Sequence, residues 1–198
     1  FVGEGRLWSA FDTGPGNGLM DLAVRIATGG RAAMDKDGRF ASRGKPDLEK
    51  VERLLRHPYF KRLPPKSLDK DFFGEAFLRK NFPPINHRRL PDILATLSLL
   101  TALSIAQSYQ RFAPKKKRLA EVVISGGGAL NPVLMRRLKE LLSPIPVVTS
   151  EKYAMPVMAK EAACFAWQAH RARLGQTNNC PQATGARGRR VLGKIIPI

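Results

Sequence analysis

The sequence predicts an α/β fold, in which short buried strands alternate with helices. Two apolar segments of strand length, Leu119–Ile124 and Pro146–Thr149, flank a stretch with helical periodicity. Glycine-rich turns follow two apolar segments, at Phe11–Asn17 and at Ser125–Ala129. The 198 residues are 43% hydrophobic, which is enough for a packed core. Together these features favour helices packed on a sheet.

Helical spacing recurs through the first half of the chain. We expect a helix from Leu19 to Ala27, ended by Gly29, and a second helix that starts at Gly44–Asp47. The apolar stripe of the second helix, expected in the core, consists of Leu48, Val51, Leu54 and Leu55. The longest helix is expected from about Pro91 to Phe112, with a largely apolar face for packing.

The segments between these helices carry turn and extended signals. Asp35–Gly38 predicts a turn, because the further ligands of a calcium loop are missing. The paired prolines of Pro64–Ser67 predict a stiff, extended segment that holds Lys66 at a defined place. Residues 74–89 show no clear period, so we expect a mobile connection there.

The second half of the chain repeats the strand, turn and helix order. Leu119–Ile124 predicts a buried strand, and Asn131-Pro132 starts a helix. After the strand at Pro146–Thr149, a helix is expected over Ala159–Arg173. Its Cys164 and Trp167 are predicted to lie in the core. The remaining predictions are a loop over Gly175–Arg190 and a final strand over Val191–Ile196.

Composition limits the class of protein. The two cysteines lack metal-ligand spacing and are too few for a disulfide framework. No apolar run approaches the roughly 20 residues of a membrane span, and no signal peptide is visible, which predicts a soluble cytoplasmic protein. The chain starts at Phe1 within a strand pattern, so we expect it to be a fragment, and a targeting segment could precede it.

The formal net charge of +18 raises nucleic-acid binding as a rival function. Most of the excess lies in the C-terminal half, with its densest runs at Lys115–Arg118 and at Arg187, Arg189 and Arg190. Neither run alternates with aromatic residues as a base-stacking groove does. The pattern therefore favours a solvated basic face over a nucleic-acid site.

The first glycine-rich turn, Phe11–Asn17, is the first candidate ligand site. Its glycines let the backbone approach a ligand, and free N–H groups before a helix suit phosphate or sugar oxygens. Asp12, at the end of an apolar segment, is placed to accept a proton. The alternative is that Gly14-Pro15-Gly16 only makes a tight turn and that Asp12 caps the following helix.

The triglycine turn is the second candidate. Gly126, Gly127 and Gly128 follow a strand and precede a helix, where backbone can touch a nucleotide. The turn is neither a Walker motif nor a GxGxxG fingerprint. The alternative is that its glycines only let the helix pack closely on the strand.

Motifs along nearly the whole chain resemble those of the anhydro-N-acetylmuramic acid kinase family, which includes the fungal levoglucosan kinases. In the family's order they are Phe11–Asn17 with Leu19–Asp21, Asp35–Gly38, His57–Phe60, Pro64–Ser67, Ala95–Leu97 with Thr101-Ala102, Ser125–Pro132, Lys160–Ala162 with Phe165–Gln168, and Val191–Lys194. Each motif alone is weak, whereas eight in order are strong. The chain departs from the family at Leu68–Asp71, where relatives carry Thr-Gly-Arg-Glu.

The resemblance implies one lobe of an actin-like, two-lobed fold of the sugar kinase, Hsp70 and actin type. Residues 1–198 would be the C-terminal lobe, without the N-terminal lobe and its phosphate loop. It also implies ATP and Mg²⁺ as cofactors, an anhydro-sugar as substrate and a homodimer as one oligomeric state. The expected activity opens the 1,6-anhydro ring of anhydro-N-acetylmuramic acid or levoglucosan with water and phosphorylates O6.

The resemblance also implies roles for single residues. Asp12 would be the general base, Thr13, Gly14 and Asn17 would contact the sugar, and Gly126, Gly127, Gly128 and Asn131 would contact the nucleotide. Glu161 would bind the sugar or Mg²⁺, although an acid at a helix start also suits the helix dipole. Two alternatives stay open: a non-catalytic nucleotide- or sugar-binding lobe, and a basic nucleic-acid module.

Overall fold

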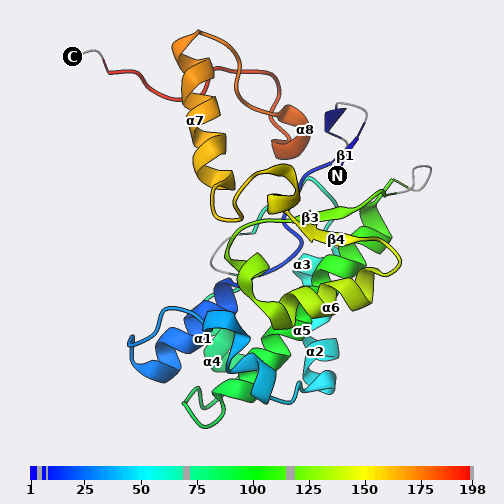
Figure 1. The fold of residues 1–198 in the computed structure, drawn as a ribbon, viewed down its shortest axis with the longest axis vertical. Coiled ribbons are helices and arrows are strands. Elements are labelled where there is room, and N and C mark those ends of the chain that lie inside the picture. Colours follow the sequence, from blue (N-terminus) through cyan, green and yellow to red (C-terminus); the bar gives the residue numbers. More distant parts are fainter. Residues whose placement is uncertain (4–5, 8, 69–71, 115–118, 197–198) are drawn as a thin grey trace.

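The computed structural model describes residues 1–3, 6–7, 9–68, 72–114 and 119–196 (Figure 1). Its first half contains the hairpin strands β1 (Val2–Gly3) and β2 (Arg6–Leu7), and then α1 (Gly18–Thr28), α2 (Leu48–Leu55), α3 (Pro58–Lys61), α4 (Glu75–Asn81) and α5 (Leu90–Phe112). Its second half contains β3 (Val122–Ile124), α6 (Pro132–Leu142), β4 (Val147–Thr149), α7 (Lys160–Arg173) and α8 (Pro181–Thr184). Short 3₁₀ turns cover Lys36–Gly38, Ala41–Arg43, Gly127–Leu130 and Ser150–Tyr153.

Helix α5 is the centre of the core, and α1, α2 and α6 pack around it (Figure 1). Its Leu90, Leu94, Leu97 and Leu100 are almost fully buried, as the apolar spacing predicts. At 23 residues, α5 is long and apolar enough to cross a membrane, contrary to the expectation that no segment is. Because 67% of its most apolar window is buried inside the fold, α5 is a core helix.

Two small sheets give the fold its α/β character. Strand β3 pairs in parallel with β4, with Val122 opposite Val147 and Ile124 opposite Thr149. Strands β1 and β2 form an antiparallel hairpin, which Ser9 extends by exchanging hydrogen bonds with Phe1 at 2.7 and 3.3 Å. The expectation of a buried strand over Leu119–Ile124 is wrong at Val123, whose side chain is exposed because no described element covers it.

The segments around α2 and α4 differ from prediction in two respects. Val51 and Leu54 of α2 are buried, but Leu48 in the first turn is exposed. The predicted mobile connection over 74–89 contains α4, whose Leu78 is fully buried. Pro83 and Pro84 follow one residue after the end of α4, and its seven residues are too few to give a clear period in the sequence.

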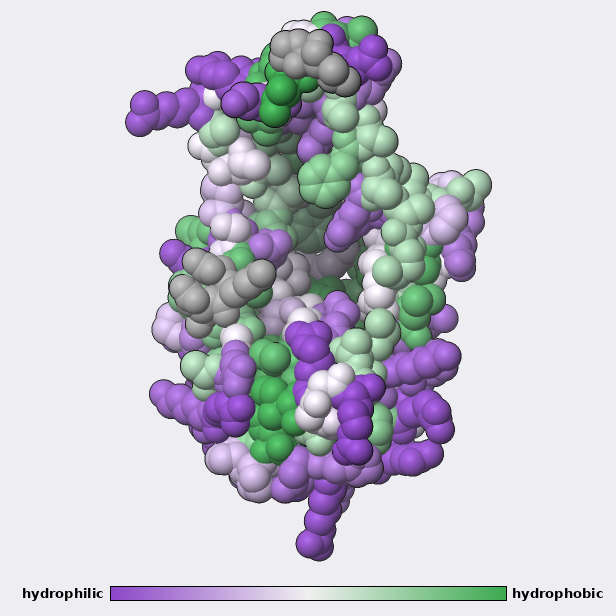
Figure 2. Space-filling view, turned by 90° about the vertical axis from the view of Figure 1, so that its left-hand side faces the viewer, coloured by the Kyte–Doolittle hydropathy of each residue, from purple (hydrophilic) through white to green (hydrophobic). Residues whose placement is uncertain are grey.

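Helices α7 and α8 and the tail extend away from the helical body (Figure 1). Figure 2 shows that the surface is hollowed between this part and the body below. Helix α7 buries none of its residues: Trp167 is 53% exposed and Cys164 is also exposed, so the prediction that both lie in the core is wrong. The helix has the expected apolar pattern, but no described element packs over it.

The predicted final strand over Val191–Ile196 is also wrong for the described residues. The side chain of Asn178 accepts a hydrogen bond from the Leu192 N–H at 2.6 Å and donates one to the Leu192 carbonyl at 3.0 Å. Both backbone groups of Leu192 are thereby satisfied without a neighbouring strand. The segment runs as an irregular tail beside α7 (Figure 1).

Candidate functional site

Asp12 lies in an exposed loop that two other segments hold in place. Its backbone N–H donates to the Lys66 carbonyl at 3.1 Å, and its carboxylate accepts a hydrogen bond of 2.7 Å from the Leu68 N–H. The strand before it ends at Leu7, so Asp12 does not lie at a strand end as the sequence indicated. The alternative role as a helix cap is also wrong, because the residue before α1 is Asn17.

Tyr59, from α3, contacts the backbone of Asp12. Its hydroxyl donates a hydrogen bond of 2.9 Å to the Asp12 carbonyl, and the residue is 1% exposed. Burial and the nearby Asp12 carboxylate raise the pKa of Tyr59 to about 12, so its hydroxyl stays a donor through the physiological range. Tyr59 lies in the first turn of α3, and His57 caps this helix. The Nδ1 of His57 accepts a hydrogen bond of 3.2 Å from the Tyr59 N–H. His57 therefore has a structural role at the start of this helix.

Lys66 completes this arrangement, at the defined place that the paired prolines predict. Its side chain is 8% exposed, and its ammonium lies 4.9, 5.4 and 5.7 Å from the ring centroids of Tyr59, Phe112 and Phe11. Burial, together with nearby Arg111 and Arg62, lowers the pKa of this ammonium. Of the neighbouring departure from the family at Leu68–Asp71, residues 69–71 lie outside the described part of the chain.

The rest of the first glycine-rich turn packs on α5. The Thr101 hydroxyl donates a hydrogen bond of 2.8 Å to the Gly16 carbonyl and so joins the turn to α5. A Cβ on Gly14 would lie 2.6 Å from the Ser104 oxygen, so close packing alone requires glycine there. Thr13, in the same turn, is half-buried.

The triglycine turn follows β3 and leads into α6. Gly126 has a φ of 85°, which favours glycine, and its N–H donates to the Val157 carbonyl at 2.6 Å. Asn131 caps α6: its side-chain oxygen accepts hydrogen bonds from the Val133 and Leu134 N–H groups at 3.0 and 3.3 Å. Only the amide nitrogen of Asn131 is therefore left for a ligand.

Asn17 connects the two glycine-rich turns. A Cβ on Gly127 would lie 3.6 Å from the Asn17 amide nitrogen, which itself donates to the Asp21 carboxylate at 2.9 Å. A cavity of about 570 Å³ opens beside this contact. Its lining comes from α1, from the loop that contains Lys36, and from the triglycine turn, and it includes Gly127, Gly128 and Asn131.

The lining of this cavity combines polar and apolar side chains. Burial raises the pKa of Asp21, whose carboxylate faces the cavity. Met20, Met34 and Met158 supply adaptable apolar contacts. The backbone of Gly127 and Gly128 and the side chain of Lys36 supply donors, and Asp21, Asp35 and Asp37 supply acceptors, so the lining can hold a ligand with both kinds of polar group.

Glu161 is not joined to the other predicted residues. It is exposed in the first turn of α7, and within the described ranges it makes no hydrogen bond or ion pair with Asp12 or Asn17. Within these ranges, no group of three His, Cys, Asp or Glu side chains could hold a metal ion. Mg²⁺ in nucleotide sites is commonly held by one or two carboxylates together with phosphate oxygens and water.

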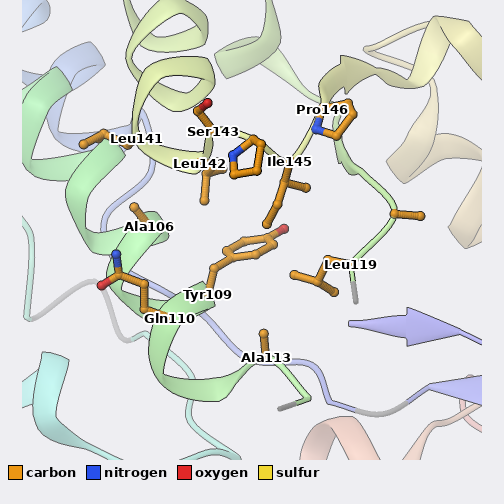
Figure 3. A pocket seen from close by; sticks show the side chains of 12 residues that line it. Ala106, Tyr109, Gln110, Ala113, Leu119, Leu141, Leu142, Ser143, Ile145 and Pro146 are labelled. Carbon is orange, nitrogen blue, oxygen red and sulfur yellow. The ribbon is translucent and has the colours of Figure 1, made fainter. Parts of the chain in front are cut away.

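A larger cavity lies elsewhere among the described residues. It measures about 790 Å³ and is lined by the end of α5 and by the connection between α6 and β4 (Figure 3). Tyr109 projects into it opposite Leu119 and Ile145, and the lining is mostly apolar. None of the predicted site residues lines this cavity, so its size does not make it the candidate site.

Sequence reasoning did not assign a role to Tyr59 or Asp21. The available signal for Tyr59 was its place in the His57–Phe60 motif, which carries no chemistry by itself. Asp21 was visible only as an acid in the first turn of a helix. In the fold, Tyr59 contacts Asp12 and Asp21 lines the cavity beside the triglycine turn, and sequence spacing reveals neither relationship.

Comparison with known proteins identifies the family to which the sequence is similar. The sequence model of anhydro-N-acetylmuramic acid kinase matches residues 4–198. A kinase of that name from Cyanothece sp. is 42% identical over 188 residues, which cover 93% of this chain and 49% of the relative. Those from Salinibacter ruber and Cupriavidus metallidurans are 41% and 39% identical, over 94% and 99% of this chain and 47% and 51% of each relative.

The chain thus spans about half the length of the relatives it matches. The match covers both glycine-rich turns, Tyr59, Lys66 and α7. The levoglucosan kinases are not among these relatives. The chain belongs to the anhydro-N-acetylmuramic acid kinase family.

Proposed function

We propose that this chain is the C-terminal lobe, residues 1–198, of an ATP-dependent anhydro-sugar kinase with an actin-like, two-lobed fold. The observation that carries the proposal is the Asp12 loop. The Asp12 carboxylate is exposed and accepts a hydrogen bond from the Leu68 N–H, while the backbone of Asp12 is hydrogen-bonded to Tyr59 and Lys66. Asn17, in the same glycine-rich turn, lines the cavity of about 570 Å³ that would hold the nucleotide. Family membership supplies the reaction class.

In the proposed reaction, Asp12 removes a proton from a water molecule. The water oxygen bonds to C1 of the sugar, and the bond between C1 and the bridging O6 breaks. O6 takes the γ-phosphoryl group, the bond to the β-phosphate breaks, and ADP leaves. Asp12 then returns its proton to solvent, so atoms and charge balance. Mg²⁺, when bound with ATP, neutralises phosphate charge.

The other predicted residues have assigned places in this proposal. The N–H groups of Gly127 and Gly128 and the side-chain amide nitrogen of Asn131 contact the nucleotide, and Thr13, Gly14 and Asn17 border the sugar. Gly126 shapes the turn, because its own N–H is bonded to the Val157 carbonyl. Glu161 contacts the sugar or Mg²⁺ when the second lobe closes on it. The enzyme works in the cytoplasm, where ATP is available.

Acetamido and lactyl groups distinguish anhydro-N-acetylmuramic acid from levoglucosan. The relatives described above are anhydro-N-acetylmuramic acid kinases, so we propose that sugar as the substrate. The test uses the full gene product that contains this chain, incubated with ATP, Mg²⁺ and either sugar. We expect ADP release and a ring-opened 6-phosphate, seen by phosphorus NMR and by a mass gain of one water and one phosphoryl group.

Two results would contradict the proposal. If neither sugar is phosphorylated although ATP binds, the chain is a non-catalytic nucleotide-binding lobe. If the protein binds neither nucleotide nor sugar but binds nucleic acid with a steep salt dependence, its net charge of +18 reflects a basic module. The Lys115–Arg118 run lies outside the described residues, whereas Arg187, Arg189 and Arg190 are exposed on the tail.

A further inference from the structure

Burying the charged side chain of Lys66 costs free energy, and the need to fill space in the core does not explain why a charged residue is there. A buried ammonium loses hydration, and the lowered pKa of Lys66 reports that cost. Methionine has a similar length, contacts aromatic rings favourably and carries no charge to desolvate. A fold that needed only a filled aromatic pocket would be at least as stable with methionine at this position.

Lys66 contacts two residues that adjoin Asp12 directly. The ammonium lies over the rings of Phe11, which precedes Asp12, and of Tyr59, which donates to the Asp12 carbonyl. It also approaches the Tyr59 carbonyl at 3.5 Å. The backbone of the same lysine accepts the Asp12 N–H, and two residues later the Leu68 N–H donates to the carboxylate.

From this arrangement, which rests on the proposed function, we infer that Lys66 is a positioning residue for the general base. Its cation draws the rings of Phe11, Tyr59 and Phe112 together and so fixes the two segments that grip the Asp12 carboxylate. Lys66 itself is too deeply buried to contact a substrate. It acts on the reaction through the orientation of Asp12.

The test compares three variants of the full gene product. Lys66→Met removes the charge and keeps the length, Lys66→Arg keeps the charge, and Lys50→Met is the matched control. Lys50 is suited to this use because its ammonium also lies over a ring, 5.1 Å from the centroid of Phe82, and its side chain is 17% exposed. It lies at α2, away from the Asp12 loop.

We expect Lys66→Met to lower kcat at least about tenfold, with KM for ATP unchanged, because small displacements of a catalytic group cost large factors in rate. Its Tm should be unchanged or higher, since the desolvation cost disappears. Lys66→Arg should restore part of the rate, and Lys50→Met should keep the full rate. Amide hydrogen exchange at Asp12 and Leu68 should accelerate in Lys66→Met alone.

The outcomes separate this inference from the proposed function. A Lys66→Met protein with normal kcat and normal exchange at both amides would overturn the inference. A variant with a lowered Tm and faster exchange throughout the chain would also overturn it, because the role would then be structural. If the wild-type protein phosphorylates no anhydro-sugar, the proposed function fails, and the amide exchange at Asp12 and Leu68 still decides whether Lys66 positions the loop.

Discussion

The hydroxyl of Tyr59 donates a hydrogen bond of 2.9 Å to the backbone carbonyl of Asp12, across 47 residues of sequence. Tyr59 is buried in a cluster of aromatic side chains, while the Asp12 carboxylate is exposed to solvent. The bond therefore ties an exposed acid to a rigid part of the core. Residues that act on this connection should change activity more than stability.

Tyr59→Phe tests the connection directly. The ring and its packing remain, but the Asp12 carbonyl loses its donor. We expect a loss of about 0.5–1.5 kcal/mol in the free energy of unfolding, the usual net value of such a bond. A larger effect is expected on kcat, because the loop of the general base loosens. Urea denaturation and steady-state kinetics measure the two effects, and a variant with full kcat would show that the bond does not position Asp12.

Gly14→Ala tests how tightly the loop packs on α5. The new Cβ would meet the Ser104 oxygen at 2.6 Å, so we expect about 1–3 kcal/mol of destabilisation from overpacking. Gly18→Ala is the control, because no atom lies within 4 Å of its Cβ. Adding Ser104→Ala should restore part of the lost stability. Equal stability of the two glycine variants in thermal unfolding would refute the close approach.

Asn131→Ser separates two roles of one side chain. Serine keeps an oxygen that can cap α6, but it lacks the amide nitrogen that faces the cavity. We expect stability close to wild type and weaker ATP binding by isothermal calorimetry. Asn131→Ala should in addition cost about 1 kcal/mol of stability, since the cap is lost. If Asn131→Ser binds ATP as tightly as wild type, Asn131 only caps the helix.

His57 predicts a pH dependence of stability. Burial lowers the pKa of His57 below its usual 6.5, so between the folded and unfolded values the unfolded chain binds more protons than the native one. Stability should therefore fall as the pH drops below 6.5. His57→Asn keeps an acceptor for the Tyr59 N–H and removes the titration. Chemical denaturation from pH 7.5 to pH 5 should show a smaller loss for the variant, and parallel curves would argue against this assignment.

The parts of the fold that were predictable from sequence are those set by local rules. Helices α1, α5 and α6 follow their apolar spacing, and Gly29 and Asn131 end and start helices where their residue types predict. The errors arose where tertiary context decides. Helix α7 has an apolar helical pattern, but its Trp167 is exposed in the described structure. At Leu192, the Asn178 side chain takes the place of a neighbouring strand.

The candidate site was predictable to a similar degree. Asp12 and the triglycine turn are recognisable because glycine and acid patterns reveal chemistry locally. Tyr59 and Lys66 were not assigned roles, since their contacts with Asp12 join segments about 50 residues apart, and no spacing rule connects them. The closeness of Asn17 to Gly127 likewise appears only in the fold.

The most direct test of the account is the rate of ADP release by the full gene product and by its Asp12→Asn variant, with anhydro-N-acetylmuramic acid as substrate. Asparagine keeps an oxygen that can accept the Leu68 N–H, so the loop should stay folded. We predict that turnover falls at least about a hundredfold, in the range reported for loss of a general base, while Tm and ATP affinity stay near wild type. A variant that keeps the wild-type rate would contradict the assignment of Asp12 as the base.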